Sequence, residues 1–335
     1  MKLPPGKIPV DILKDVVFKN LGAERSEVVL GPAAGLDGAI LDVGSKNAIV
    51  SMDPITGAVE HVGWEAININ ANDVATFGVE PAFFFSCLLL PENADSKIVE
   101  TISSQMNAAA KELGIAIVGG HCESTPGLSN PIVVGCVMGL TEKGKYVTAA
   151  DAKSGDKLIL TKSAGIEGTA ILASDREEQL RKVFGPALLA SAKSFYSQIS
   201  VVKDALTAYG TGGANAMHDP TEGGVLNGIH EMADAAGLGV RVFEEKIMVE
   251  PETVKICRFY EIDPLQLTGS GALLVAAKPE GANKIVDALS REHIYAEVIG
   301  EFNPNPNKRI LMHKDDSAEM LPRPTSDHLW MALTH

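Results

Sequence analysis

The chain has 335 residues, of which 45% are hydrophobic and 21% are charged, and its formal net charge is −14. A chain of this length exceeds what one hydrophobic core usually supports, so we expect two domains. The acidic balance without a basic cluster argues against nucleic-acid binding, and the lack of an apolar run of about 18 residues argues against a membrane span, so we expect a soluble, cytoplasmic protein.

The first half of the chain alternates strand-like runs with two amphipathic stretches. Helices are predicted at residues 62–76 and 97–113, where apolar residues recur at helical spacing. Strands are predicted at five runs rich in apolar residues, namely 39–43, 48–52, 82–90, 115–118 and 132–140.

The second half begins after a small, polar break at residues 146–155, YVTAADAKSG. We therefore expect domains at residues 1–150 and 151–335. The pattern of the second half predicts strands at 157–162, 239–243, 272–277 and 296–300, helices at 165–173, 186–208, 223–236 and 280–290, and a short docked helix at 327–333. Because strands and helices do not alternate strictly, the order favours an α+β fold over a doubly wound sheet.

The four cysteines, Cys87, Cys122, Cys136 and Cys257, are widely spaced and form no C-x-x-C pair. Three of them lie in apolar or mixed strand-like runs. We therefore expect buried or half-buried thiols.

Several familiar catalytic motifs are incomplete in this sequence. Residues 139–146, GLTEKGKY, come within one residue of a phosphate loop, but Tyr146 stands where Ser or Thr would bind the metal. His230 and Glu231 begin an H-E-x-x-H-like string, but Asp234 replaces the second His of a zinc site. No G-x-S-x-G elbow or G-x-G-x-x-G turn between strand and helix is present, so serine hydrolases and Rossmann dehydrogenases lose their strongest support.

Acidic turns, most of them flanked by glycine, are the signal that remains. They are Gly35-Leu36-Asp37-Gly38, Asp53 to Gly57, Asn72-Asp73 and His218 to Gly224. Each alone is also ordinary turn chemistry, because Asp before Gly or Pro is a common turn residue. Together they suit Mg²⁺, which binds through one or two carboxylates and substrate phosphates.

Two further features accompany the acidic turns. Glu65, Asn68 and Asn72 lie at helical spacing near Asp73 and form a polar stripe on the predicted helix. Residues 119–123, GGHCE, follow an apolar strand, and their paired glycines would let the backbone approach a phosphate, although a tight strand-to-loop turn explains them equally well.

The order of these segments resembles the aminoimidazole ribonucleotide synthetase (PurM-like) superfamily and, within it, the HypE-like branch. The resemblance covers nearly the whole chain and is carried by residues 36–39, 51–53, 72–75, 78–81, 118–121, 155–161, 219–224 and 262–265. It implies an N-terminal domain whose sheet pairs with its twin in a homodimer, and a C-terminal α+β domain that closes over ATP.

The resemblance also assigns roles to residues. It implies Mg²⁺ and phosphate ligands at Asp37, Asp53 and Asp73, and it implies contacts to ATP at Asp37, Gly38, Asn72, Gly119 and Gly120. Positioning and neutralisation of charge by metal ions would supply most of the catalysis in such a site.

Two departures from the family pattern bear on the chemistry. Relatives of the HypE-like branch carry a C-terminal cysteine that is itself the substrate thiol, whereas the last cysteine here is Cys257. We therefore expect another substrate. His121 stands where related kinases have an Asp after Gly-Gly, so we consider Glu123 as a substitute ligand and His121 as a phosphate contact or proton carrier.

Three functions follow as hypotheses. The first is an ATP- and Mg²⁺-dependent enzyme that phosphorylates a carbonyl-type oxygen of a small molecule or partner protein, in metabolism like that of hydrogenase maturation. The second is a thiamine-phosphate-type kinase, and the third is a nucleotide-binding assembly factor without catalysis. In the enzymes we assign Asp219 and His121 as the catalytic residues, with Asp219 as base or metal ligand.

Overall fold

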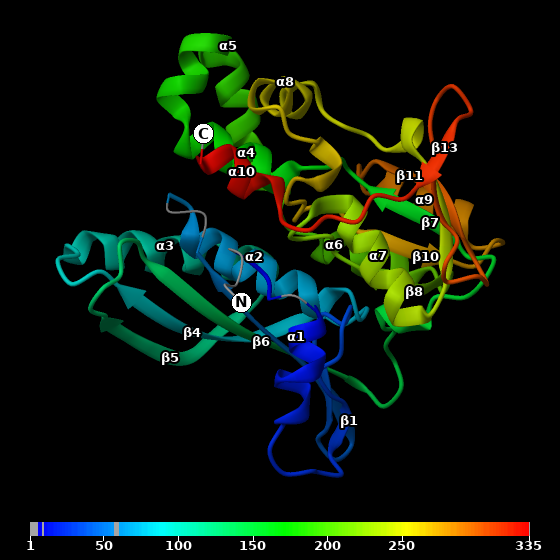
Figure 1. The fold of residues 1–335 in the computed structure, drawn as a ribbon. Helices are drawn as coiled ribbons and strands as arrows, with labels where there is room; N and C mark the ends of the chain where they lie inside the picture. The colour runs from blue at the N-terminus through cyan, green and yellow to red at the C-terminus, as the bar shows by residue number, and fades with distance from the viewer. Residues whose placement is uncertain (1–5, 9, 57–59, 335) are drawn as a thin grey trace.

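The computed structural model describes residues 6–8, 10–56 and 60–334. Two mixed sheets, one in each half of the chain, are joined by a segment that contains the 3-10 turn η2 (Ala149–Asp151). Figure 1 shows the first half below and the second half above, with the helix α2 between them. The predicted division near residue 150 falls in this joining segment.

The first sheet has six strands in the order β1-β2-β3-β6-β4-β5. Their bounds are β1 Val28–Leu30, β2 Ala39–Asp42, β3 Lys46–Ile55, β4 Pro81–Leu90, β5 Ala116–Ser124 and β6 Ile132–Glu142. All neighbours are antiparallel except β4 and β5, which run parallel and leave β5 as an edge strand.

The helices α2 (Val62–Ala75) and α3 (Ser96–Leu113) cover one face of this sheet (Figure 1). Apolar residues alternate along β6, so that Val133 and Val137 point into the core beneath α2 while their neighbours point the other way. The helix α2 is buried on nearly all sides because the second half packs against its outer surface. This explains why its sequence carries little amphipathic contrast.

The second sheet has seven strands in the order β13-β12-β9-β11-β7-β10-β8. Their bounds are β7 Lys157–Thr161, β8 Ala214–His218, β9 Gly239–Phe243, β10 Leu274–Ala277, β11 Ala296–Asn303, β12 Arg309–Met312 and β13 Ala318–Met320. Both faces are covered, because Leu158 and Leu160 of β7 belong to one core and Ile159 to the other. The core that contains Ile159 continues into the first half, so the two domains share apolar packing.

The helices outside the first sheet are α1 Val10–Asp15, α4 Ile166–Asp175, α5 Glu177–Lys193, α6 Val202–Gly210, α7 Gly224–Ala236, α8 Pro251–Tyr260, α9 Ala282–Arg291 and α10 His328–Thr334. The α+β class is confirmed by the two sheets and their segregated helices. The short C-terminal helix predicted from the sequence is confirmed as α10, which packs against α4.

Several predicted elements are corrected by the structure. The helix predicted at 186–208 is interrupted, since α5 ends at Lys193 and α6 begins only at Val202. The strand predicted at 115–118 continues to Ser124, because its pairing with β4 extends over the glycines. Cys122 is exposed rather than buried, because every residue of the edge strand β5 is exposed, on both faces of the sheet.

Candidate active site

Four carboxylates from separate elements meet where the two halves face each other. Asp53 belongs to β3 and Asp73 to α2, while Asp37 lies in the loop before β2 and Asp219 directly after β8. The loop that carries Asp37 is anchored by Leu36, which packs on the second core. The structure therefore brings the three predicted metal ligands and Asp219 into one region.

Ser51 links two of these aspartates. Its Oγ lies 2.6 Å from Asp73 Oδ2 and 2.7 Å from the backbone oxygen of Asp37. Burial raises the pKa of Asp73 well above its usual range, and Asp53, Asp219 and Asp37 raise it further. A carboxylate in these surroundings is stabilised in its charged form by a bound cation.

Asp53 is positioned by an asparagine of α2. Its backbone N–H donates to Asn70 Oδ1 at 2.9 Å, and Asn70 Nδ2 donates to its backbone oxygen at 3.3 Å. The pKa of Asp53 is raised mainly by burial, although Lys7 opposes the shift. These two bonds fix the backbone of Asp53, while its side chain interacts with that of Asp73.

His218 stands between two carboxylates. Its Nδ1 lies 2.6 Å from Asp37 Oδ1 and its Nε2 lies 3.0 Å from Glu231 Oε2. Burial lowers the pKa of His218, but Asp37 and Glu231 more than offset this and raise it well above the ordinary value. Burial would raise the pKa of Glu231, yet Lys7 and His218 lower it to about 2. The imidazolium therefore holds Asp37 and Glu231 in fixed positions.

Asp219 is buried, and its carboxylate lacks hydrogen-bond partners in the described part of the chain. Its side chain is 1% exposed, and neither carboxylate oxygen has a hydrogen-bond partner among the described residues. Burial and then Asp37 raise its pKa well above the usual range. Buried carboxylates without partners are costly unless they coordinate a metal, so this residue fits a cation-binding role.

The most compact group of ligand atoms in the described chain is formed by Asp37, His218 and Asp219, whose atoms lie within 4.8 Å of one another. Asp53 and Asp73 lie outside that group and close to each other, as their mutual electrostatic effects indicate. Such a split arrangement fits Mg²⁺ ions that take only one or two protein carboxylates each and complete their shells with phosphate and water.

A cleft of about 1020 Å³ opens beside Asp37 and His218. Its walls come from α1, the loop before β2, one side of α7 and residues 323–327, and they include the cations Lys7, Lys14 and Arg323. A volume of this size accommodates a nucleotide. Basic side chains next to a carboxylate cluster are what phosphates and their metal ions require.

Gly38 and Asn72 were also predicted to contact ATP, and the structure shows what each residue does locally. Gly38 follows Asp37, and a Cβ on it would lie 2.8 Å from the Val50 backbone oxygen, so glycine permits the close approach of two backbones. Asn72 is fully buried, with Nδ2 donating to the Ile199 oxygen at 2.9 Å and Oδ1 accepting from Val201 N–H at 2.7 Å. Both ends of its amide thus join α2 to the second half, and its contact with ATP stays a prediction.

Gly119, Gly120 and His121 are not brought to the aspartates within one chain. They lie on β5, which β6 and β4 separate from β3. Gly120 is required by the close approach of Ser86, whose oxygen would lie 1.9 Å from an added Cβ. His121 is exposed, with Nε2 3.0 Å from Glu123 Oε2. The turn expected at these glycines is therefore a strand interior.

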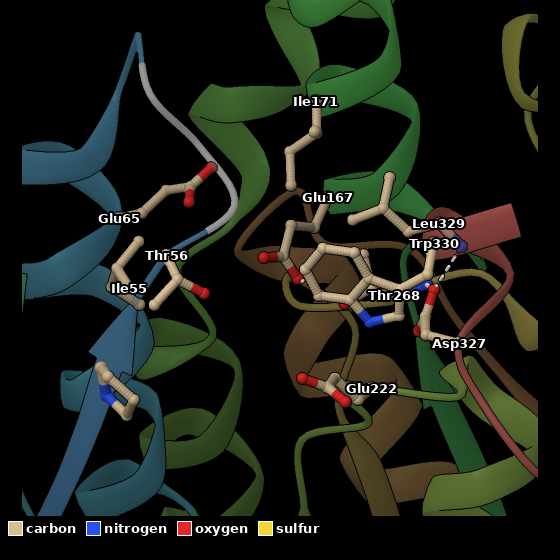
Figure 2. Close-up of a pocket in the computed structure, with 11 residues that line it drawn as sticks. Ile55, Thr56, Glu65, Glu167, Ile171, Glu222, Thr268, Asp327, Leu329 and Trp330 are labelled. Carbon is tan, nitrogen blue, oxygen red and sulfur yellow. Dashed lines mark hydrogen bonds between the residues drawn. The ribbon is translucent and has the colours of Figure 1, made fainter. Parts of the chain in front are cut away.

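A second cavity, of about 90 Å³, lies beside the end of β3 (Figure 2). Its acidic lining residues are Glu65, Glu167, Glu222 and Asp327. In the sequence, Glu222 and His218 belong to the acidic turn at residues 218–224, but neither residue was given a role, and Glu167, Asp327 and Lys7 were not assigned to the site. The closest signals were the polar stripe that begins at Glu65 and the docked helix that follows Asp327, but neither pattern identifies what it faces.

No helix in the described residues is long and apolar enough to cross a membrane.

Two family models match the chain. AIR synthase related protein, N-terminal domain, matches residues 35–141, and AIR synthase related protein, C-terminal domain, matches residues 153–313. Together the two models span most of the chain and both of its sheets except the edge strands β1 and β13.

Curated relatives align along most of the chain. A Methanocaldococcus jannaschii protein named for hydrogenase expression and formation is 28% identical over 334 residues, covering 96% of this chain and 95% of the relative. The carbamoyl dehydratase HypE of Rhizobium leguminosarum bv. viciae is 26% identical and covers 83% of this chain and 80% of the relative.

Solved structures share the fold. A chain of a HypE-HypF complex superposes with a TM-score of 0.78 at 21% identity, covering 93% of this chain and 99% of the other. The hydrogenase maturation protein HypE in complex with ATP gives a TM-score of 0.73 at 21% identity, with 98% of each chain covered. The two-domain architecture is therefore that of these proteins.

Proposed function

Because the chain belongs to the AIR synthase related proteins and is HypE-like, we propose that it is an ATP- and Mg²⁺-dependent enzyme that activates a carbonyl-type oxygen by phosphorylation, as carbamoyl dehydratases of hydrogenase maturation do. The observation that carries the proposal is the orphaned carboxylate of Asp219 beside Asp37, Asp53 and Asp73. Such a cluster is costly without cations and suited to metal-bound phosphates.

The binding of ATP follows from the position of the large cleft. Its phosphates would lie toward Asp37, with Lys7 and Arg323 at the walls. Mg²⁺ would be held by Asp37 and Asp219 on one side and by Asp53 and Asp73 on the other, and bound Mg²⁺ neutralises the charge on the phosphates. His218 keeps the Asp37 carboxylate in place through its 2.6 Å contact.

The proposed reaction has two steps. The acceptor's carbonyl oxygen attacks the γ-phosphorus, the bond from that phosphorus to the β-phosphate oxygen breaks, and ADP leaves. The phosphorylated oxygen then departs as inorganic phosphate. With a carbamoyl-type acceptor, two N–H protons are lost and a nitrile forms, which is a net dehydration. The role of this chain is positioning and charge stabilisation, with Asp219 as metal ligand or proton acceptor.

A homodimer is part of the proposal. Met52, Cys136 and Phe85 are neighbours in register across β3, β6 and β4, on the face of the first sheet that α2 and α3 do not cover. Met52 is 62% exposed and Phe85 is 43% exposed. A contiguous apolar sheet face with a free edge strand is a surface suited to a second copy. We also propose a cytoplasmic protein, with a partner protein as one source of substrate.

The thiamine-phosphate-type kinase and the non-catalytic assembly factor are distinguished from this function by the fate of the γ-phosphate. ATP labelled at the γ-position is incubated with Mg²⁺ and with purine, thiamine and carbamoyl-type candidates. Release of inorganic phosphate with a dehydrated product supports the proposal, and label on the product identifies a kinase. Binding of Mg²⁺-ATP without turnover of any candidate favours the assembly factor.

The site assignment has its own test. Asp53→Asn and Asp73→Asn should each abolish ATP turnover while circular dichroism shows an intact fold. Asp287→Asn, on the exposed side of α9, is the matched control and should keep full activity. Activity retained in both site variants would contradict the assignment.

A further inference from the structure

The small cavity of about 90 Å³ lies where an acceptor of the proposed phosphoryl group would reach the aspartates. Pro54, Ile55 and Thr56, which line it, follow directly after Asp53 on the chain. Glu222 and Asp327 line both this cavity and the nucleotide cleft. The two spaces therefore adjoin, and a ligand in the smaller one lies next to the ends of the elements that carry Asp53 and Asp219.

Glu65 points an unsatisfied carboxylate into this cavity (Figure 2). The residue is 1% exposed, and its Oε1 has no hydrogen-bond partner among the described residues. Burial, followed by the charge of Glu167, raises its pKa well above the usual range. A buried acceptor without a donor indicates a ligand that supplies one.

The carboxylates of Asp327 and Glu167, which also line the cavity, differ in how many hydrogen bonds they accept. Asp327 accepts from the backbone N–H groups of Gly223 at 2.6 Å, Leu329 at 2.6 Å and Thr268 at 3.2 Å, so it serves mainly to attach α10. Glu167 accepts from Thr268 Oγ1 at 2.8 Å through Oε2, and Ser270 also lies beside its carboxylate, so Glu167 is more satisfied than Glu65. Glu65 and Glu167 therefore retain the capacity to bind a ligand from opposite sides.

The described lining of this cavity contains no Lys, Arg or His, and among its carboxylates Lys7 meets Glu222, whose Oε2 accepts from the Lys7 backbone N–H at 2.7 Å. Lys7 is near, but its Nζ donates to Thr221 Oγ1 at 2.9 Å and lies 3.8 Å from Glu231. The cavity carboxylates do not form a metal cage either, because in the described chain only Asp37, His218 and Asp219 gather three ligand atoms within 4.8 Å. Carboxylates spread around a cavity fit an organic cation with several N–H donors.

Trp330 supplies the aromatic wall of the cavity. Figure 2 shows its indole ring beside Glu167 and Thr268, across the cavity from Glu65. Gly6 lies against the Nε1 edge of the ring, since a Cβ on it would lie 2.9 Å from Trp330 Nε1 and 2.4 Å from Glu222 Oε2. An indole ring next to carboxylates favours a planar cation over a neutral group of the same shape.

We propose that this cavity selects the acceptor substrate by binding an amidinium- or guanidinium-like head group between Glu65 and Glu167, against Trp330. The inference rests on the proposed function for the identification of this ligand as the acceptor. A cavity of about 90 Å³ has room for about three water molecules, which is the volume of a planar group of a few heavy atoms. The oxygen to be phosphorylated would lie on the substrate beyond this head group, toward Asp53.

The test compares acetamidinium with acetamide, which has the same shape and no charge. Each probe is titrated into the full chain at constant ionic strength and followed by saturation-transfer NMR. A probe with so few atoms should bind at a concentration on the order of millimolar. In the wild-type protein acetamidinium should bind about tenfold more tightly than acetamide, as expected for charge-assisted contacts with buried carboxylates.

Two variants assign the preference to this cavity. Glu65→Gln should reduce the ratio of the two affinities to about one, and Glu167→Gln should reduce it in the same direction. Glu112→Gln, exposed on α3, is the matched control and should keep the wild-type ratio. Equal binding of the two probes by the wild-type protein, or a ratio unchanged in both cavity variants, would overturn the proposal.

Calorimetry with Mg²⁺-ATP on the same samples separates this inference from the function it rests on. Binding of acetamidinium through Glu65 without any binding of ATP would refute the proposed function and leave the cation site standing. Normal binding of ATP with no preference for the cation would refute the cation site alone.

Discussion

His218 Nδ1 lies 2.6 Å from Asp37 Oδ1, and this contact joins the end of a strand in the second half to a loop of the first half. The two residues are 181 positions apart in the chain. The imidazole is 3% exposed and has Glu231 on its other side at 3.0 Å. The cation that neutralises a metal ligand is thus itself part of the contact between domains.

Replacing this histidine should destabilise the fold. His218→Asn removes a buried cation and leaves Asp37 and Glu231 without their partner, which typically costs about 3 kcal/mol or more in the free energy of unfolding. Urea denaturation measures the change. His293→Asn is the control, since His293 is exposed and Asn tolerates its positive φ of 62°. Equal stability of the two variants would contradict the role of His218.

Replacing Asp219 should lower the turnover of ATP without lowering the stability of the fold. Asp219→Asn eliminates a buried charge that has no partner in the described chain, so the free energy of unfolding without metal should stay constant or rise. Mg²⁺-dependent turnover of ATP should fall about 100-fold or more, a loss of about 2.7 kcal/mol in transition-state stabilisation. Steady-state kinetics and urea denaturation on one preparation check both parts. A large loss of stability with little loss of turnover would show that Asp219 is structural.

Glu65 should make stability depend on pH. Its pKa in the folded chain lies above the ordinary 4.5, so the folded state binds this proton more tightly than the unfolded state. The stabilisation is complete below about pH 4.5 and is lost as pH rises toward the folded pKa, by up to about 1.4 kcal/mol per pH unit. The free energy of unfolding should therefore decrease more between about pH 5 and pH 8 in the wild-type protein than in Glu65→Gln. Parallel pH profiles would refute the shift.

Asn72 should stabilise the contact between the two domains through its two hydrogen bonds. Asn72→Ala removes the hydrogen bonds to the Ile199 oxygen and the Val201 N–H, and it leaves both backbone groups buried without partners. Such a loss should cost about 2 to 4 kcal/mol in the free energy of unfolding. Asn68→Ala is the control, because Asn68 makes one bond within α2, to the Trp64 oxygen. A fall in ATP affinity at unchanged stability would instead support the predicted contact of Asn72 with the cofactor.

The face of the first sheet that α2 and α3 leave uncovered should form the interface of the proposed homodimer. Phe85→Asp places a charge in the apolar row with Met52 and Cys136, so a homodimer formed through this face should dissociate into monomers. Sedimentation velocity measures the change in mass. Val183→Asp, at an exposed position of α5, should leave the mass unaltered. A dimer that persists in Phe85→Asp would place the interface elsewhere.

Much of the secondary structure could be read from local pattern. The helix α2 and the strands β4 and β6 lie within two residues of their predicted bounds, since long apolar runs and clear periodicity specify them. The pattern failed between residues 186 and 208, where the turn η3 (Ser194–Gln198) divides a stretch of good helix formers between α5 and α6. It also failed at β8, because a short buried strand has no distinctive periodicity.

The sequence alone determined the acidic segments with Asp37, Asp53, Asp73 and Asp219 and their order along the chain, because glycine-flanked and strand-end positions are local properties. The structure corrects two of the predicted turns, since Asp53 lies within β3 and Asp73 within α2. Only the tertiary structure decided which side chains surround them. His218 pairs with Asp37 and Glu65 faces Glu167 because the second half packs against α2, and contacts between residues so distant in sequence depend on packing rather than on local pattern. The same packing left Glu65 and Asp219 with unpaired oxygens, and these give the site its proposed ligands.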